Sequence, residues 1–200
     1  MNITNLLAGV AIGAVVTTIA GVAYALSRAG EPVAGPAPGA AGPVFPTVRG
    51  ENLNKRPFEL PAGFDAPYSV VMVAFYQRQQ EDVNTWLPTA AELAKDHANV
   101  EYYELPTISA QWGLMRGWVD GGMRSGIPAF AARERTITLY TDTAEFRRIA
   151  GIDDPERIWV GLVDRAGVIH WSARGTMNAD SERGLRTAVG DLAAPQSKGL

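Results

Sequence analysis

The side chains that could carry chemistry in this chain are few and scattered. The sequence contains no cysteine, so none of its residues can attack a disulfide or a peroxide as a thiolate. Its only histidines, His97 and His170, fall late in a predicted helix and in a predicted strand. Ser125 lies in Met-Arg-Ser-Gly, which lacks the G-x-S-x-G spacing of a nucleophile elbow. We therefore expect no catalytic residues, no bound metal and no cofactor.

The segment Val73–Pro88 contains a strand end at Phe75, a short loop and the start of a helix. Its layout resembles, without a gap, the F-W-A-x-W-C-x-x-C-x-x-E-x-P stretch of membrane-anchored thioredoxin-like proteins. The resemblance places Gln80 and Val83 where the two cysteines would be. It implies a thioredoxin-like fold from which the redox pair has been lost. The carboxylates of residues 81 and 82 are explained by the helix dipole and by capping, with Asp82 as the expected N-cap.

The cis-proline that thioredoxin-like proteins place before a later strand is also displaced. The resemblance puts Ile158 at that position, whereas Pro155 lies earlier and Pro128 precedes no strand of the right kind. The sequence leaves open whether the Asp154–Pro155 bond is cis or trans.

Composition favours one globular domain attached to an anchor. The chain has 200 residues, of which 46% are hydrophobic and 20% are charged, and such a chain can bury a core. The net charge is −3, and the 18 basic residues form no block. Nucleic acid is therefore not an expected partner.

Residues 6–26 carry no charge and would cover roughly 31 Å as a helix, about the thickness of a bilayer core. We expect an uncleaved single-pass anchor spanning residues 1–26, in a bacterial inner membrane. The alternative is a signal peptide cleaved after Ala25, although the N-terminus lacks the usual basic residues. Arg28, offset by Glu31, leaves the side of the membrane undetermined.

Small residues recur along one face of this predicted anchor. They could let another membrane helix approach closely, or they could merely reflect an alanine-rich composition. The residues are Gly9, Gly13, Thr17, Gly21 and Ala25.

Residues 27–43 are rich in Gly, Ala and Pro and predict a tether, which leaves residues 44–200 as the domain. The expected fold class is α/β, a thioredoxin-like central sheet with flanking helices, preceded by one transmembrane helix. Asp164, Gly167 and Gly175 are the expected turn residues of its C-terminal half. The expected strands are 44–48, 57–60, 69–76, 100–105, 136–140, 158–164 and 168–171, and the expected helices are 82–97, 143–150 and 180–192.

The segment 106–135 is additional to the elements of a minimal thioredoxin. One helical face within it would carry Trp112, Met115, Trp118 or Val119, and Met123. Such a face could bind a partner, or it could pack into the domain's own core. Arg124 would then lie at a solvated edge or receive an anionic group.

Short motifs across residues 45–192 resemble the cysteine-free thioredoxin-like assembly factors of the mitochondrial ATP synthase membrane sector. They are Gly-Met-Arg-x-Gly, Ile137-Thr-Leu-Tyr140 followed by Glu-Phe-Arg-Arg148, and Val-Gly-Leu-Val-Asp-x-x-Gly-x-Ile-x-Trp171. The resemblance implies a chaperone-like factor that helps a hydrophobic membrane subunit join its complex, with no catalytic residues. The anchor and tether differ from a mitochondrial presequence, so the client is not implied.

The expected function is therefore that of a redox-inactive assembly factor or chaperone with a protein partner. The expected binding edge comprises Gln80, Trp86 and the loop before Ile158, together with the Trp112–Met123 segment. The rival interpretation is a periplasmic accessory protein that binds a peptide, a small ligand or a cofactor, or a cofactor-dependent enzyme that uses the vacated groove.

We predict that the protein has no oxidoreductase activity of its own. No scaffold replaces a missing nucleophile, so insulin-disulfide reduction and peroxide consumption should proceed at the buffer rate. Activity above that rate without an added cofactor would contradict the prediction.

Overall fold

The computed structural model describes residues 43–111 and 116–193. The predicted anchor at 6–26, nearly all of the tether, Trp112 and Met115 lie outside these residues, as does the side chain of Trp118. Within the described part, no helix has both the length and the apolar character needed to cross a bilayer.

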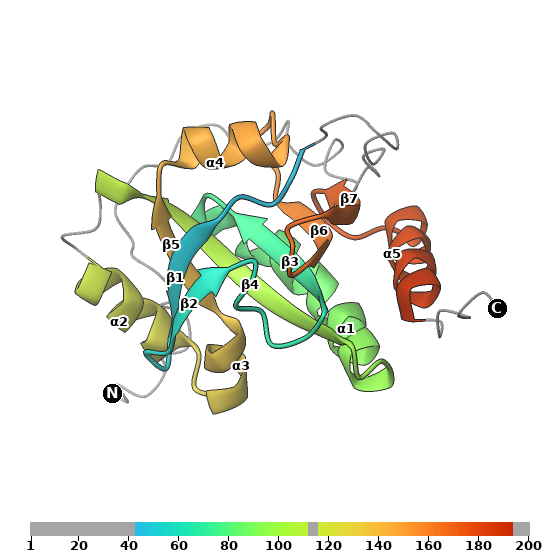
Figure 1. Ribbon diagram of the computed structural model, residues 1–200. Coiled ribbons are helices and arrows are strands. Elements are labelled where there is room, and N and C mark those ends of the chain that lie inside the picture. Colours follow the sequence, from blue (N-terminus) through green and yellow to red (C-terminus); the bar gives the residue numbers. More distant parts are fainter. Residues whose placement is uncertain (1–42, 112–115, 194–200) are drawn as a thin grey trace, which may run out of the picture.

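Seven strands of the described chain form one mixed sheet in the order β2-β1-β5-β4-β3-β6-β7 (Figure 1). Strands β3, β4 and β5 run parallel to one another, whereas β1, β2, β6 and β7 join by antiparallel pairing. The continuous apolar run in β3 lies at the centre, with residues 69–73 buried, as expected for a strand covered on both faces. The bounds are β1 Val48–Asn52, β2 Pro57–Leu60, β3 Tyr68–Ala74, β4 Val100–Ser109, β5 Ile137–Thr141, β6 Trp159–Asp164 and β7 Ile169–Arg174.

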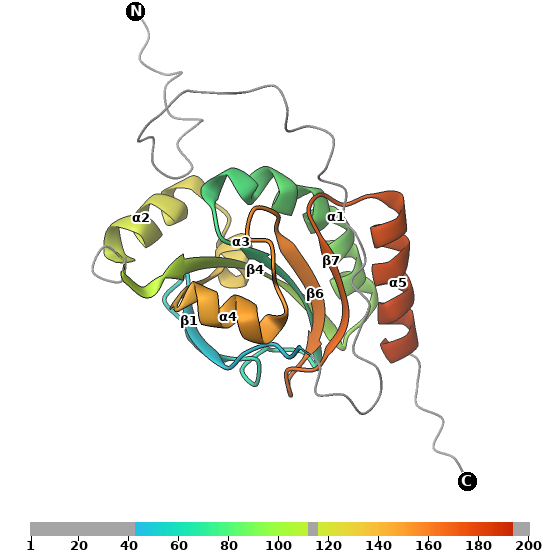
Figure 2. The same ribbon diagram turned by 90° about the horizontal axis from the view of Figure 1, so that it is seen from above.

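Helices cover both faces of this sheet. Figure 2 shows α4 on one side of the central strands and α1 on the other. The α4 side contains an apolar cluster that includes Phe45, Tyr103 and Phe146, and the α1 and α5 side contains a second cluster around Met72 and Trp86. The helices are η1 Gln77–Gln79, α1 Gln80–Asp96, α2 Arg116–Gly126, α3 Phe130–Arg135, α4 Thr143–Ala150 and α5 Ala179–Ala193.

The entry hairpin lies further along the chain than expected. Its first strand is β1, which begins at Val48, whereas the sequence predicted a strand over 44–48. The Asn52 side chain accepts hydrogen bonds from the backbone N–H groups of Asn54 and Arg56, which places the turn after residue 52. Pro46 has no N–H to donate to a strand ladder, and Val44 makes only an isolated bridge to Val168.

Two other boundaries differ from expectation. Helix α1 begins at Gln80, and its N-cap is Gln79 rather than Asp82. Asp82 is buried within the first turn instead. The segment beyond a minimal thioredoxin first extends β4 to Ser109 and then provides two helices, α2 and α3, before β5.

The β6–β7 turn is built around Asp164 and Gly167. The Asp164 carboxylate accepts from the backbone N–H groups of Ala166 and Val168 at 2.8 and 3.0 Å. Gly167 has φ of +88° and Gly175 has φ of +74°, a region that residues with a Cβ adopt only at a cost. The N–H of Gly175 donates to the Ile158 carbonyl at 2.9 Å, so this glycine connects the ends of β7 and β6.

Trp86 is a core residue and not the partner contact that the sequence suggested. Its side chain is fully buried, and its indole Nε1–H donates to the Gly175 carbonyl at 2.9 Å. Its ring packs against Trp171 at a centroid separation of 5.9 Å. Trp86 therefore links α1 to the end of β7.

We predict that Trp86→Phe lowers the free energy of unfolding by about 2–4 kcal/mol, because it leaves a smaller ring and an unpaired buried carbonyl. Urea denaturation followed by circular dichroism would measure the change. Phe130→Ala is the matched control, since Phe130 is 64% exposed, and it should shift stability by less than about 0.5 kcal/mol. Equal effects of the two changes would contradict this assignment.

Candidate binding cleft beside the vacated cysteine positions

A single glutamine joins the two loops that flank the expected active-site edge. The Gln79 side chain is fully buried, and its Oε1 accepts from the backbone N–H groups of Phe75 and Tyr76 at 2.8 and 3.1 Å. Its Nε2 donates to the Pro155 carbonyl at 2.7 Å. Gln79 thus ties the loop after β3 to the loop before β6.

An ion pair bridges the same two loops at the surface. Arg78 pairs with Glu156, and its guanidinium lies 4.2 Å from the centroid of the Tyr76 ring. The Asp154–Pro155 bond is not cis, and Ile158, at the family's cis-proline position, is fully buried. These contacts connect the two loops at the edge on which we expected a partner to dock. Phe75, Tyr76 and Pro155 of the same loops also line a hollow of about 290 Å³ there.

A larger open cleft lies between α1, β4 and the α2–α3 segment. Its volume is about 700 Å³. One wall comes from the first turns of η1 and α1, the floor from β4 and the opposite wall from α2 and α3. The lining residues are Gln77, Arg78, Gln80, Glu81, Asn84, Leu87, Glu104, Pro106, Met123, Gly126, Ile127, Ala132 and Thr136.

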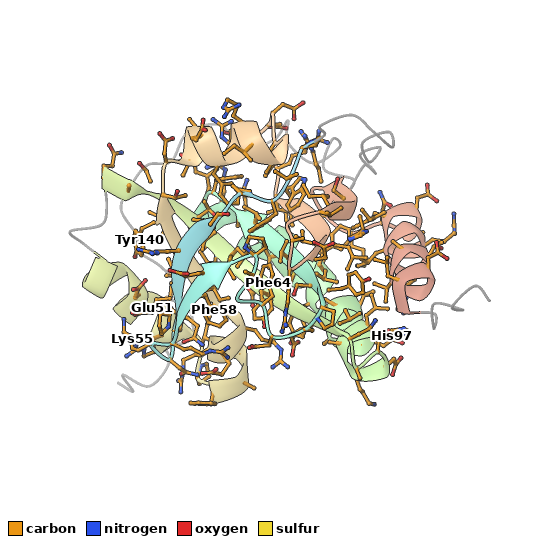
Figure 3. All side chains as sticks on the ribbon, viewed as in Figure 1. Glu51, Lys55, Phe58, Phe64, His97 and Tyr140 are labelled. Carbon is orange, nitrogen blue, oxygen red and sulfur yellow. The ribbon has the colours of Figure 1, made fainter. Side chains whose placement is uncertain are left out.

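Polar contacts on its far side hold α2 in place as the cleft wall. The buried Asp120 accepts a hydrogen bond from the Tyr140 hydroxyl at 3.0 Å and lies 3.7 Å from the Lys55 ammonium. Lys55 also pairs with Glu51, and Figure 3 shows these two hairpin residues and Tyr140 on the same side of the molecule. Arg124 donates from Nε to the Leu53 carbonyl at 2.8 Å. Asp120 and Arg124 therefore fix α2 to β5 and to the hairpin.

Glu104 provides a partly buried carboxylate on the β4 side of the cleft. In β4 it lies opposite Met72 of β3, which is fully buried, and it makes an isolated bridge to Thr136 on its other side. The Gln80 Nε2 donates to Glu104 Oε2 at 3.0 Å. Burial raises the pKa of Glu104 above its ordinary value of 4.5, and the hydrogen bond from Gln80 opposes that rise.

The structure separates the residues that the sequence grouped together. Of the two residues that the sequence resemblance aligned with cysteines, Gln80 lines the cleft and Val83 is buried in the core. Met123 is 4% exposed but lines the cleft. Arg124 contacts the hairpin backbone and does not offer a free edge.

Sequence reasoning missed Gln79 and Glu104. A signal for Glu104 was present, because Val100, Tyr102, Glu104 and Pro106 alternate along one face of β4, and a carboxylate interrupts this otherwise uncharged set. No comparable signal marked Gln79, which is one glutamine among several in the loop. Its role depends on the position of a loop that lies far away in sequence.

The two histidines lie in separate places. His97 is at the C-terminal end of α1, at the margin of the molecule in Figure 3. His170 contacts Asp164 at 2.9 Å and packs edge-on against Tyr68. Within residues 43–111 and 116–193, no group of three His, Cys, Asp or Glu side chains is arranged to hold a metal ion.

Comparisons with known proteins identify the fold. No protein-family model matches the chain, and no curated protein sequence matches it. A putative electron transfer protein from Aquifex aeolicus superposes with a TM-score of 0.51 at 8% identity, covering 74% of this chain and 94% of that chain. BsSco, a member of the Sco family of cytochrome c oxidase assembly proteins, gives 0.50 at 11% identity with the same coverages. The thioredoxin domain of a thiol-disulfide oxidoreductase from Bacteroides vulgatus gives 0.49 at 17% identity, covering 75% of this chain and 98% of that chain.

The described part of the chain has a thioredoxin-like α/β fold, with a central mixed sheet and flanking helices. At these identities the likeness establishes the fold alone. Because the sequence contains no cysteine, thiol–disulfide chemistry by its own residues is excluded. No family model supports the more specific resemblance to ATP synthase assembly factors.

We predict that Glu104→Gln raises stability at neutral pH relative to acid pH. A carboxyl whose pKa is raised on folding stabilises the protein below its unfolded value, near 4.5, and this contribution is lost as pH rises through the folded pKa. The difference in thermal midpoint, variant minus wild type, should therefore be more positive at pH 7 than at pH 4. A difference independent of pH would show that Glu104 titrates as it does in the unfolded chain.

Proposed function

We propose that this protein is a redox-inactive, membrane-anchored thioredoxin-like protein that binds a polypeptide partner, as an assembly factor or chaperone for a membrane protein complex. By resemblance, that complex is the ATP synthase membrane sector. The observation that carries the proposal is the cleft of about 700 Å³ beside the vacated cysteine position Gln80. The chain carries no cysteine at the positions that the resemblance assigns to a thiol pair. A cleft large enough to bind a ligand or a peptide lies beside one of these positions.

The walls of the cleft suit a polypeptide. Leu87, Pro106, Met123, Ile127 and Ala132 supply apolar contact area, and Asn84 and Gln80 supply hydrogen-bonding groups near the mouth. Helix α2, which forms one wall, is fixed from behind by Asp120 and Arg124. A wall that is already in place lowers the entropy cost of binding.

The membrane part of the proposal rests on residues 6–26, whose length and lack of charge suit a single span in a bacterial inner membrane. An anchor followed by a Gly, Ala and Pro tether would keep the domain near membrane subunits and raise their effective concentration.

A second candidate is the binding of a small ligand or cofactor in the same cleft. Its volume falls in the range of small-molecule sites, and such sites combine apolar walls with a few polar groups. If the cleft binds a polypeptide, a partner protein should lie next to its mouth in the native membrane. If it binds a small ligand, no partner protein is expected there.

We predict that a photo-crosslinking amino acid at position 84, in the full-length chain, captures an integral subunit of a membrane complex in native membranes. Asn84 is exposed and lines the cleft. The same amino acid at position 183 is the control, because Arg183 is exposed on α5. Mass spectrometry would identify the adducts.

A pair of neighbouring variants tests whether the cleft itself is used. Ala132→Phe places a ring in the cleft and should remove the adduct at position 84, whereas Ala131→Phe, on the exposed side of the same helix, should leave it. Equal capture from positions 84 and 183, or an adduct insensitive to Ala132→Phe, would refute partner binding at this cleft. Capture of no membrane subunit at all would favour the small-ligand candidate.

A further inference from the structure

The charges of the cleft are unevenly distributed. Glu104 lies at its floor and Glu81 at its rim, and among the described side chains that line it the one cation is Arg78. Arg78 is paired with Glu156, which belongs to the loop before β6 and does not line the cleft. Glu81 is in none of the ion pairs between side chains that the structure describes. The cleft therefore presents an excess of negative charge.

Glu104 has capacity for one more strong donor. Gln80 occupies Oε2, whereas Oε1 accepts no hydrogen bond from the described residues. A carboxylate in a partly desolvated position is costly unless it is paired, and a cation that reaches it gains a charge-assisted hydrogen bond. Because Glu104 is largely removed from solvent, such an interaction would be screened less than one on an open surface.

The shape of the site indicates which kind of cation fits. Glu104 belongs to no group of three acidic or histidine side chains among the described residues that could hold a metal ion. The site suits a charged head on a long aliphatic stem, since lysine and arginine side chains bury their methylene groups against apolar surface and direct the head to a polar group. Leu87, Met123 and Ile127 are placed to contact such a stem.

We propose that the cleft selects a partner segment in which a lysine or arginine lies among apolar residues, with the basic head paired to Glu104. This inference rests on the proposed function, because it specifies the partner of the same cleft. Glu104 is the specificity-determining residue, Gln80 positions its carboxylate and the α2–α3 wall contacts the apolar flanks.

A peptide selection tests the inference. A phage-displayed library of random peptides is selected on the full-length chain in zwitterionic lipid nanodiscs, with empty nanodiscs as counter-selection. We expect enrichment of peptides that carry lysine or arginine flanked by Leu, Ile, Val or Phe. Synthetic versions in which arginine is replaced by citrulline, which keeps the shape and removes the charge, should bind at least tenfold more weakly.

Matched variants distinguish a specific role of Glu104 from a general effect of negative charge in the cleft. Glu104→Gln keeps the side-chain shape and should reduce affinity for the arginine peptides to that of the citrulline peptides. Glu81→Gln makes the same charge change at the rim and should alter affinity less than threefold, because exposed pairs contribute little. Ala132→Phe should abolish binding of both peptide types.

The outcomes distinguish this inference from the proposed function. Equal binding of arginine and citrulline peptides, equal effects of the two glutamate variants, or the absence of enriched basic peptides would overturn the selection of a basic segment. None of these results would affect capture of a membrane subunit from position 84. Loss of that capture with intact arginine selectivity would instead overturn the assembly role and leave the recognition chemistry in place.

Discussion

The hydrogen bonds of Gln79 are the constraint on which the rest of the candidate site depends. They join the loop after β3 to the loop before β6, and both loops end at the same edge of the sheet. The buried amide satisfies two backbone donors and one backbone acceptor at once. Arg78 and Glu156 connect the same two loops at the surface. The larger cleft lies beside this connection, because Arg78 and Gln80 line it.

The α2–α3 segment forms one wall of the larger cleft. Polar contacts to other parts of the fold determine where this segment lies. Helix α2 contains glycines at 117, 121, 122 and 126, so its intrinsic helix propensity is low. Its position comes from tertiary contacts: the buried Asp120 to Tyr140 and Lys55, and Arg124 to the hairpin backbone. The early hairpin, far away in sequence, therefore determines where a wall of the cleft stands. A mutation at Lys55 or Tyr140 would therefore shift this wall, although neither residue lines the cleft.

Local patterns were sufficient to predict the strands after the entry hairpin and the helices at 143–150 and 180–192. The apolar run of β3, the Asp164–Gly167 turn and the helix at 143–150 could be read from the sequence because neighbouring residues determine each of them. The hairpin was displaced because the Asn52 side chain sets its turn, and this is a geometric effect that periodicity does not report. Trp86 was assigned to a surface because its type suits both a core and an interface. Only its position opposite Gly175 distinguishes the two.

Glu104 is a local inconsistency in the pattern of β4, and no motif marks it. Its strand neighbours on the same face include Tyr102 and Pro106, and a hydrophobic residue there would avoid the cost of desolvating a carboxylate. In a sequence that specifies one fold, local propensity, hydrophobic pattern and packing favour the same structure. Positions where these preferences conflict are expected at functional sites. The Gln80 amide mitigates the cost without removing it, since the pKa of Glu104 remains raised. The partner proposed for Glu104, a basic side chain from outside the chain, would offset this cost of desolvation.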